Sequence, residues 1–134
     1  MKSFKNAVPF SAASQIMTLI FIVIIIFHGC ALIGIIPMDM IWGGRLKTKE
    51  ELIVFESISL TLNLIMLMVV KLKSGNWKLS IHKGVIQTAL WIMVILFALN
   101  TLGNLVALNS LETWIFTPIT LILSILSLRL VLEG

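Results

Sequence analysis

The stretch QIMTLIFIVIIIFHGCALIGIIP, residues 15–37, decides the fold of this chain. It contains no Asp, Glu, Lys or Arg, and we expect Pro37 to end it because proline disrupts a helix interior. About 20 apolar residues in a helix are enough to cross the hydrocarbon core of a bilayer. The stretch therefore predicts a transmembrane helix over residues 15–37.

Three more apolar runs follow, over residues 52–70, 84–107 and 114–131. Of the 134 residues, 59% are hydrophobic and only 12% are charged, whereas a soluble domain carries about 25% charged residues. Helices are expected because isolated strands cannot satisfy their backbone groups in lipid. We predict an all-α fold, an integral membrane antiparallel four-transmembrane-helix bundle, as a single membrane domain over residues 1–134.

The positive charge of the chain is expected to meet membrane lipid. The formal net charge is +4, and no basic stripe with interleaved aromatic residues lies on a water-facing element, which argues against a nucleic-acid partner. Seven basic residues fall on the side of the two termini: Lys2, Lys5, Lys71, Lys73, Lys78, Lys83 and Arg129. Three fall on the other side: Arg45, Lys47 and Lys49. The positive-inside rule therefore predicts that both termini are cytoplasmic.

Two acidic residues have a sufficient structural explanation as helix caps. Thr48 and Glu51 have the spacing of a capping box, in which each side chain bonds the backbone N–H of the other. Asn109 and Glu112 have the same spacing before the fourth span. We therefore expect neither Glu51 nor Glu112 to be catalytic.

Polar residues inside the spans recur at helical spacing and at similar depth. Glu56, Ser59 and Asn63 share one helix face, because residues three and four apart lie one above another. Similar stripes occur in the third span (Asn100, Asn104) and the fourth span (Thr117, Thr120, Ser124, Ser127). At about 1.5 Å per residue, Glu56 and Asn100 lie roughly 8 Å to the outer side of the bilayer centre, and His28 and Asn63 lie within roughly 3 Å of it. These residues predict a narrow polar seam that opens outward, or alternatively hydrogen bonding between packed helices.

Glu56 is the residue that the spans explain least. A buried acid needs a partner or a function, since an ionised group in hydrocarbon is costly. One interpretation pairs Glu56 with Arg45 to close the outer end of the bundle. A second makes Glu56 a protonatable or ligand-binding group, and a third leaves it exposed at the headgroup level.

The connector between the first two spans contains the most distinctive local string, Trp42-Gly43-Gly44-Arg45. Paired glycines permit positive φ and a tight reversal, and Arg45 can bind an anionic group through two hydrogen bonds. The string predicts either a lid over a binding site or an interfacial turn with a Trp anchor and a snorkelling Arg.

Catalytic and cofactor motifs are absent from the sequence. There is no HExxH, CxxC, phosphate-binding loop or GxSxG string, and Cys30 is the single cysteine. We predict no metal, no cofactor and no assigned catalytic residue, and the balance is against an enzyme.

The leading hypothesis is a binding protein for a lipophilic or amphipathic small molecule. Its outward-opening pocket would be lined by His28, Glu56, Asn63 and Asn100, with Trp42 and Arg45 at the mouth. The alternative is a non-catalytic accessory, assembly or immunity subunit, which has a membrane-protein partner or forms a homo-oligomer. A third hypothesis is a lipid-modifying or isomerising enzyme that uses Glu56 and His28 as an acid/base pair.

Overall fold

A computed structural model describes residues 1–107, 110 and 112–134 of the chain. Within these residues, four helices are long and apolar enough to cross a membrane: Phe10–Leu32 (α2), Lys49–Lys73 (α3), Lys83–Leu105 (α4) and Thr113–Val131. The fourth crossing combines a π-helical turn, η3 (Glu112–Phe116), with α5 (Thr117–Val131). Short helices precede and join the crossings: α1 (Lys2–Ala7), η1 (Met38–Met40) and η2 (Trp42–Gly44). The predicted all-α integral membrane bundle is confirmed.

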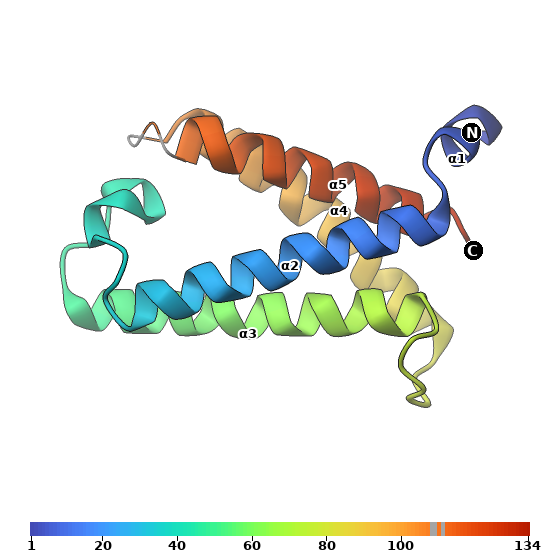
Figure 1. Ribbon diagram of the computed structural model, residues 1–134, viewed down its shortest axis with the longest axis horizontal. Coiled ribbons are helices and arrows are strands. Elements are labelled where there is room, and N and C mark those ends of the chain that lie inside the picture. The colour runs from blue at the N-terminus through green and yellow to red at the C-terminus, as the bar shows by residue number, and fades with distance from the viewer. Residues whose placement is uncertain (108–109, 111) are drawn as a thin grey trace.

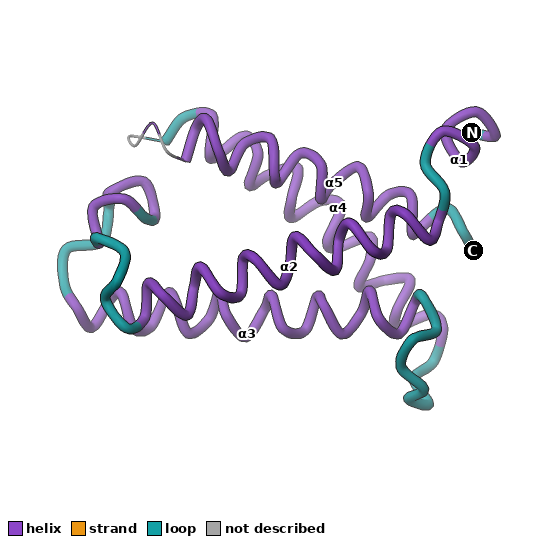
Figure 2. The backbone as a smooth tube through the Cα atoms, viewed as in Figure 1, coloured by secondary structure: helices purple, strands orange, loops and turns teal. Residues whose placement is uncertain are grey.

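The crossings form two antiparallel hairpins (Figures 1 and 2). α2 packs along α3, and α4 packs along α5, while α2 also contacts α5 and α3 contacts α4. Both termini and residues 74–82 lie at one end of the bundle, here called the terminus end. Residues 33–48 lie at the opposite end, here called the connector end, where the two hairpins diverge in Figure 1.

The first crossing is shifted toward the N-terminus relative to the prediction of residues 15–37. α2 begins after Pro9, because the residues that follow contain no helix breaker. It ends five residues before Pro37, where Gly34 adopts a φ of 84°. The Gly34 N–H donates to the carbonyl of Ala31, and the Ile35 N–H donates to that of Cys30. This pair of bonds is a Schellman motif, which a glycine with positive φ favours.

The predicted capping box at the start of α3 is confirmed. The Thr48 hydroxyl accepts a hydrogen bond from the Glu51 N–H at 3.2 Å. The Glu51 carboxylate accepts from the N–H groups of Lys47 and Thr48 at 2.8 and 3.4 Å. α3 therefore begins at Lys49, three residues before the predicted apolar run of residues 52–70. The predicted cap at Asn109 lies outside the described residues.

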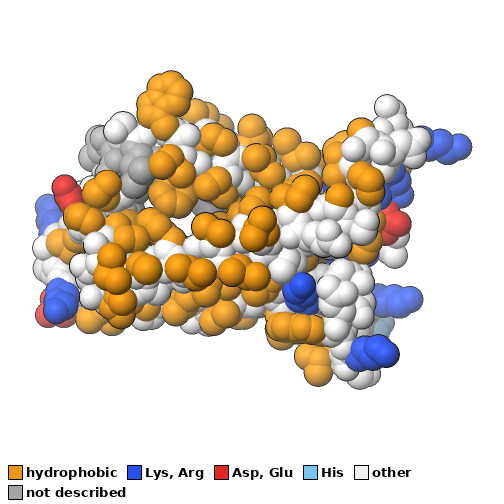
Figure 3. Space-filling model, viewed as in Figure 1, with side chains coloured by type: hydrophobic (Ala, Val, Ile, Leu, Met, Phe, Trp, Pro, Cys, Tyr) orange, Lys and Arg blue, Asp and Glu red, His pale blue; other side chains and the backbone are white. Residues whose placement is uncertain are grey.

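Apolar side chains cover the lengths of the helices, and charged side chains gather at the two ends (Figure 3). This is the surface expected of a protein whose sides face lipid. The buried core lies between the hairpins and includes Met17, Phe21, Val70, Leu90, Leu123 and Leu130.

Arg129 closes the terminus end from inside the bundle. Only 4% of it is exposed. Its Nε donates to the carbonyl of Val8 at 2.7 Å, and its Nη1 donates to Glu133 at 2.6 Å. The hydrogen bond from Arg129 also lowers the pKa of the Glu133 carboxyl. The sequence pattern places the Arg129 charge at the membrane surface, but in the structure the Arg129 side chain joins α5 to Val8, in the segment before α2.

Replacing Arg129 by leucine should lower the free energy of unfolding by about 2–3 kcal/mol, because it leaves the Val8 carbonyl without its charged donor. Unfolding in sodium dodecyl sulfate, titrated into bicelles, measures this loss. The matched control is Arg45→Leu, an exposed arginine at the other end, whose effect should stay within about 0.5 kcal/mol. Equal losses in the two variants would contradict a specific role for Arg129.

Candidate functional site

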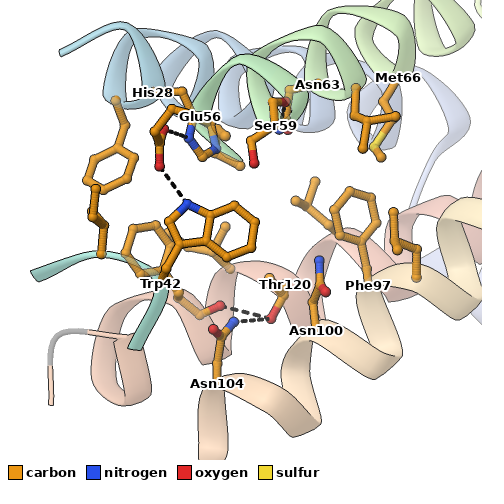
Figure 4. A pocket seen from close by; sticks show the side chains of 18 residues that line it. His28, Trp42, Glu56, Ser59, Asn63, Met66, Phe97, Asn100, Asn104 and Thr120 are labelled. Atoms are coloured by element: carbon orange, nitrogen blue, oxygen red, sulfur yellow. Dashed lines mark hydrogen bonds and ion pairs between the residues drawn. The ribbon is translucent and has the colours of Figure 1, made fainter. Parts of the chain in front are cut away.

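A cavity of about 320 Å³ lies between the two hairpins, in the half of the bundle toward the connector end. All four crossings and the connector contribute to its wall. Figure 4 shows the lining side chains converging from opposite hairpins. Ten of the lining residues are apolar, and the other eight carry a polar group: His28, Trp42, Glu56, Ser59, Asn63, Asn100, Asn104 and Thr120. Ligand pockets commonly have this size and this mixed lining.

Glu56 stands at the centre of the polar groups on one side of the cavity. Only 1% of the residue is exposed. Its Oε2 lies 2.5 Å from Nδ1 of His28, and its Oε1 accepts a hydrogen bond from the indole N–H of Trp42 at 2.8 Å. One carboxyl group therefore joins α2, α3 and the connector.

The predicted pairing of Glu56 with Arg45 is wrong, and so is the exposed placement of Glu56. Arg45 is exposed and is not among the residues that line the cavity. Arg45 comes directly after η2. Trp42, the first residue of η2, directs its ring toward Glu56 (Figure 4). His28 takes the place that sequence spacing assigned to Arg45.

The connector reaches the cavity through an unusual backbone. Trp42, Gly43 and Gly44 have φ values of 53°, 66° and 69°, so the predicted tight reversal is present. Left-handed φ costs a residue other than glycine about 1–2 kcal/mol. A hydrogen bond to a charged group contributes about 1.5–3 kcal/mol, and the Trp42 ring also packs on Phe55 with centroids 5.1 Å apart. The bond to Glu56 is therefore large enough to offset the strain at Trp42.

The polar stripe of α5 mainly joins α5 to α4, as the helix-packing alternative expects. The Thr101 hydroxyl donates to that of Thr120 at 2.9 Å, and the Ser124 hydroxyl donates to the carbonyl of Val94 at 2.9 Å. Asn104 adds a weaker bond to Thr120 at 3.4 Å. Thr117 lies outside the cavity lining, and its buried hydroxyl has no hydrogen-bond partner among the described residues.

The two remaining predicted asparagines both line the cavity but differ in their bonds. The Asn63 amide donates to the carbonyl of Ser59 in its own helix at 2.8 Å. Asn100 faces the cavity from α4 (Figure 4), and within the described part of the chain its side chain makes no hydrogen bond. Asn100 thus presents a free amide to the cavity.

The structure brings five of the six residues predicted to bind a ligand into the cavity lining, all except Arg45. The sequence analysis did not predict the aromatic side chains of this lining. Phe27, Phe97 and Phe116 also line the cavity, and the rings of Phe27 and Phe116 meet edge to face with centroids 5.1 Å apart. One of the three was detectable, because Phe97 lies three residues before Asn100 and so shares its helix face.

The chemistry of the site is that of a hydrogen-bonded acid and imidazole that face, across the cavity, an amide without a hydrogen-bond partner among the described residues. Across residues 1–107, 110 and 112–134, no group of three or more His, Cys, Asp or Glu residues is placed to hold a metal ion. No family model, curated protein or solved structure matches the chain.

Trp42→Phe should lower the free energy of unfolding by about 1.5–3 kcal/mol, because phenylalanine keeps a ring but removes the donor to Glu56. The left-handed strain remains, since phenylalanine also has a Cβ. Detergent unfolding followed by circular dichroism measures the change. Trp91→Phe, at a position 46% exposed on α4, is the matched control and should change little. A Trp42 variant as stable as that control would show that the hydrogen bond contributes nothing.

Proposed function

We propose that this protein binds a lipophilic or amphipathic small molecule within the membrane, in the cavity between its two hairpins. One observation carries the proposal: the cavity of about 320 Å³ has a largely apolar lining, yet it also exposes the amide of Asn100, which has no hydrogen-bond partner among the described residues. Apolar walls favour the body of such a molecule, and a few fixed polar groups orient it.

The alternative of an accessory subunit explains only part of the site. It requires the polar groups to act as hydrogen bonds between helices, and this describes Thr120 and Ser124 well. It gives no account of Asn100, whose amide forms no bond to another described residue. Asn100 therefore favours the binding proposal.

We further propose that the cavity opens toward the outer side of the membrane. The support is the distribution of Lys and Arg, since seven lie at the terminus end and three in the connector, and basic residues favour the cytoplasmic side. A ligand would then enter from the outer leaflet or from the outer aqueous phase.

Filling the cavity tests binding directly. In Ser59→Phe, the new ring occupies cavity space, because Ser59 lines the wall and is 9% exposed. The measurement is mass spectrometry of the small molecules that copurify with the protein in mild detergent. We expect at least one lipophilic species to copurify near stoichiometrically with the unaltered protein and to fall about tenfold in the variant, as loss of about 1.4 kcal/mol in affinity would produce.

The matched control is Ser57→Phe, which places the same ring two residues away at an exposed position outside the cavity lining. This variant should retain the copurifying species. If all three proteins carry the same lipids in the same amounts, the cavity binds nothing specifically and the proposal is wrong.

A further inference from the structure

The cavity wall contains a carboxyl group but no basic side chain other than His28. Among the lining residues, Glu56 is the only acid, and there is no Lys or Arg. His28 is the only other titratable group in the wall, and it carries charge only when protonated. A neutral His28 that donates its Nδ1–H to Glu56 leaves a net negative charge in the cavity.

This charge restricts the class of ligand. An anionic group in the cavity would meet the Glu56 carboxylate at short range, in surroundings where water screens little, so repulsion would exclude it. Fatty acids and phosphate groups are therefore poor candidates for the interior. A cation instead gains from the same charge.

Aromatic rings surround the same space. Trp42 lies beside Glu56, and Phe27, Phe97 and Phe116 complete the wall. The faces of aromatic rings attract cations, and tryptophan does so most strongly. This attraction grows when the site is poorly hydrated, as it is between helices in a membrane. An acid and several rings around one cavity together favour an ammonium group that carries apolar substituents.

We propose that the ligand of the cavity is a lipophilic organic cation, with its positive charge near Glu56 and Trp42 and its apolar body among the phenylalanine rings. This inference rests on the proposed function, because it names the ligand class of the same cavity. Asn100, on the opposite hairpin, adds a polar amide to the wall of the same cavity.

Two probes of the same shape separate charge from apolar contact. Phenyltrimethylammonium carries a positive charge, and tert-butylbenzene is its uncharged carbon counterpart. The reporter is the indole N–H signal of Trp42 in ¹⁵N nuclear magnetic resonance spectra of the full chain in micelles. Trp42 is one of four tryptophans in the sequence, and its signal is identified by its loss in Trp42→Phe. The other three signals serve as internal controls for partition of the probe into the micelle.

We expect phenyltrimethylammonium to shift the Trp42 signal selectively and to bind about tenfold or more tightly than tert-butylbenzene, as expected when one charge pair forms in a poorly hydrated site. Glu56→Gln keeps an acceptor oxygen but removes the charge, so it should abolish this preference. Retained binding of the neutral probe also shows that the variant is folded. Glu50→Gln, the same change at an exposed position on α3, should retain the preference.

The outcomes separate this inference from the proposed function. If both probes bind equally, or if Glu56→Gln keeps the preference for the cation, the ligand class is wrong while binding in the cavity stands. If an uncharged or anionic molecule copurifies with the protein and is lost in Ser59→Phe, the proposed ligand class is likewise wrong while binding in the cavity stands. If neither probe shifts Trp42 selectively and no species is lost in Ser59→Phe, both proposals fail.

Discussion

A carboxyl group buried between transmembrane helices is the constraint on which the connector end of this protein depends. Glu56 is 1% exposed, and burial of an unpaired carboxylate would cost several kcal/mol. The structure satisfies both of its oxygens from different elements, His28 on α2 and Trp42 in the connector. The position of the connector, the strained backbone of Trp42 and the polar edge of the cavity all follow from this one requirement.

The two ends of the bundle differ in how the space between the helices is filled. At the terminus end, long polar side chains bond backbone carbonyls, as Arg129 does with Val8 and Gln87 with Val131. These bonds close the space between the helices. At the connector end, the short polar side chains of α5 are used between α4 and α5. Beside the cavity, the rings of Phe27 and Phe116 join the two hairpins, while the bond of Trp42 to Glu56 stays within the hairpin of α2 and α3.

The sequence was sufficient to predict the elements but not how their faces meet. Apolar runs predict the four crossings, and spacing predicts that Glu56, Ser59 and Asn63 share a face. Depth along a helix says nothing of rotation about its axis, so the same reasoning left the partner of Glu56 open between Arg45 and His28, and the structure pairs it with His28. Pro37 was expected to end α2, yet the local hydrogen bonds at Gly34 end it first. The contact between Arg129 and Val8 joins residues 121 positions apart, which no local pattern encodes.

Arg129 is a basic residue that the folded chain withdraws from the membrane surface. By sequence it is one of seven basic residues on the side of the termini, and the prediction that this side is cytoplasmic counts each of them. Once the bundle has closed, its guanidinium is bonded within the protein and withdrawn from the lipid headgroups. The charge that the sequence places at the membrane surface is therefore used in helix association, and the folded molecule presents one fewer arginine to the bilayer than the count of basic residues suggests.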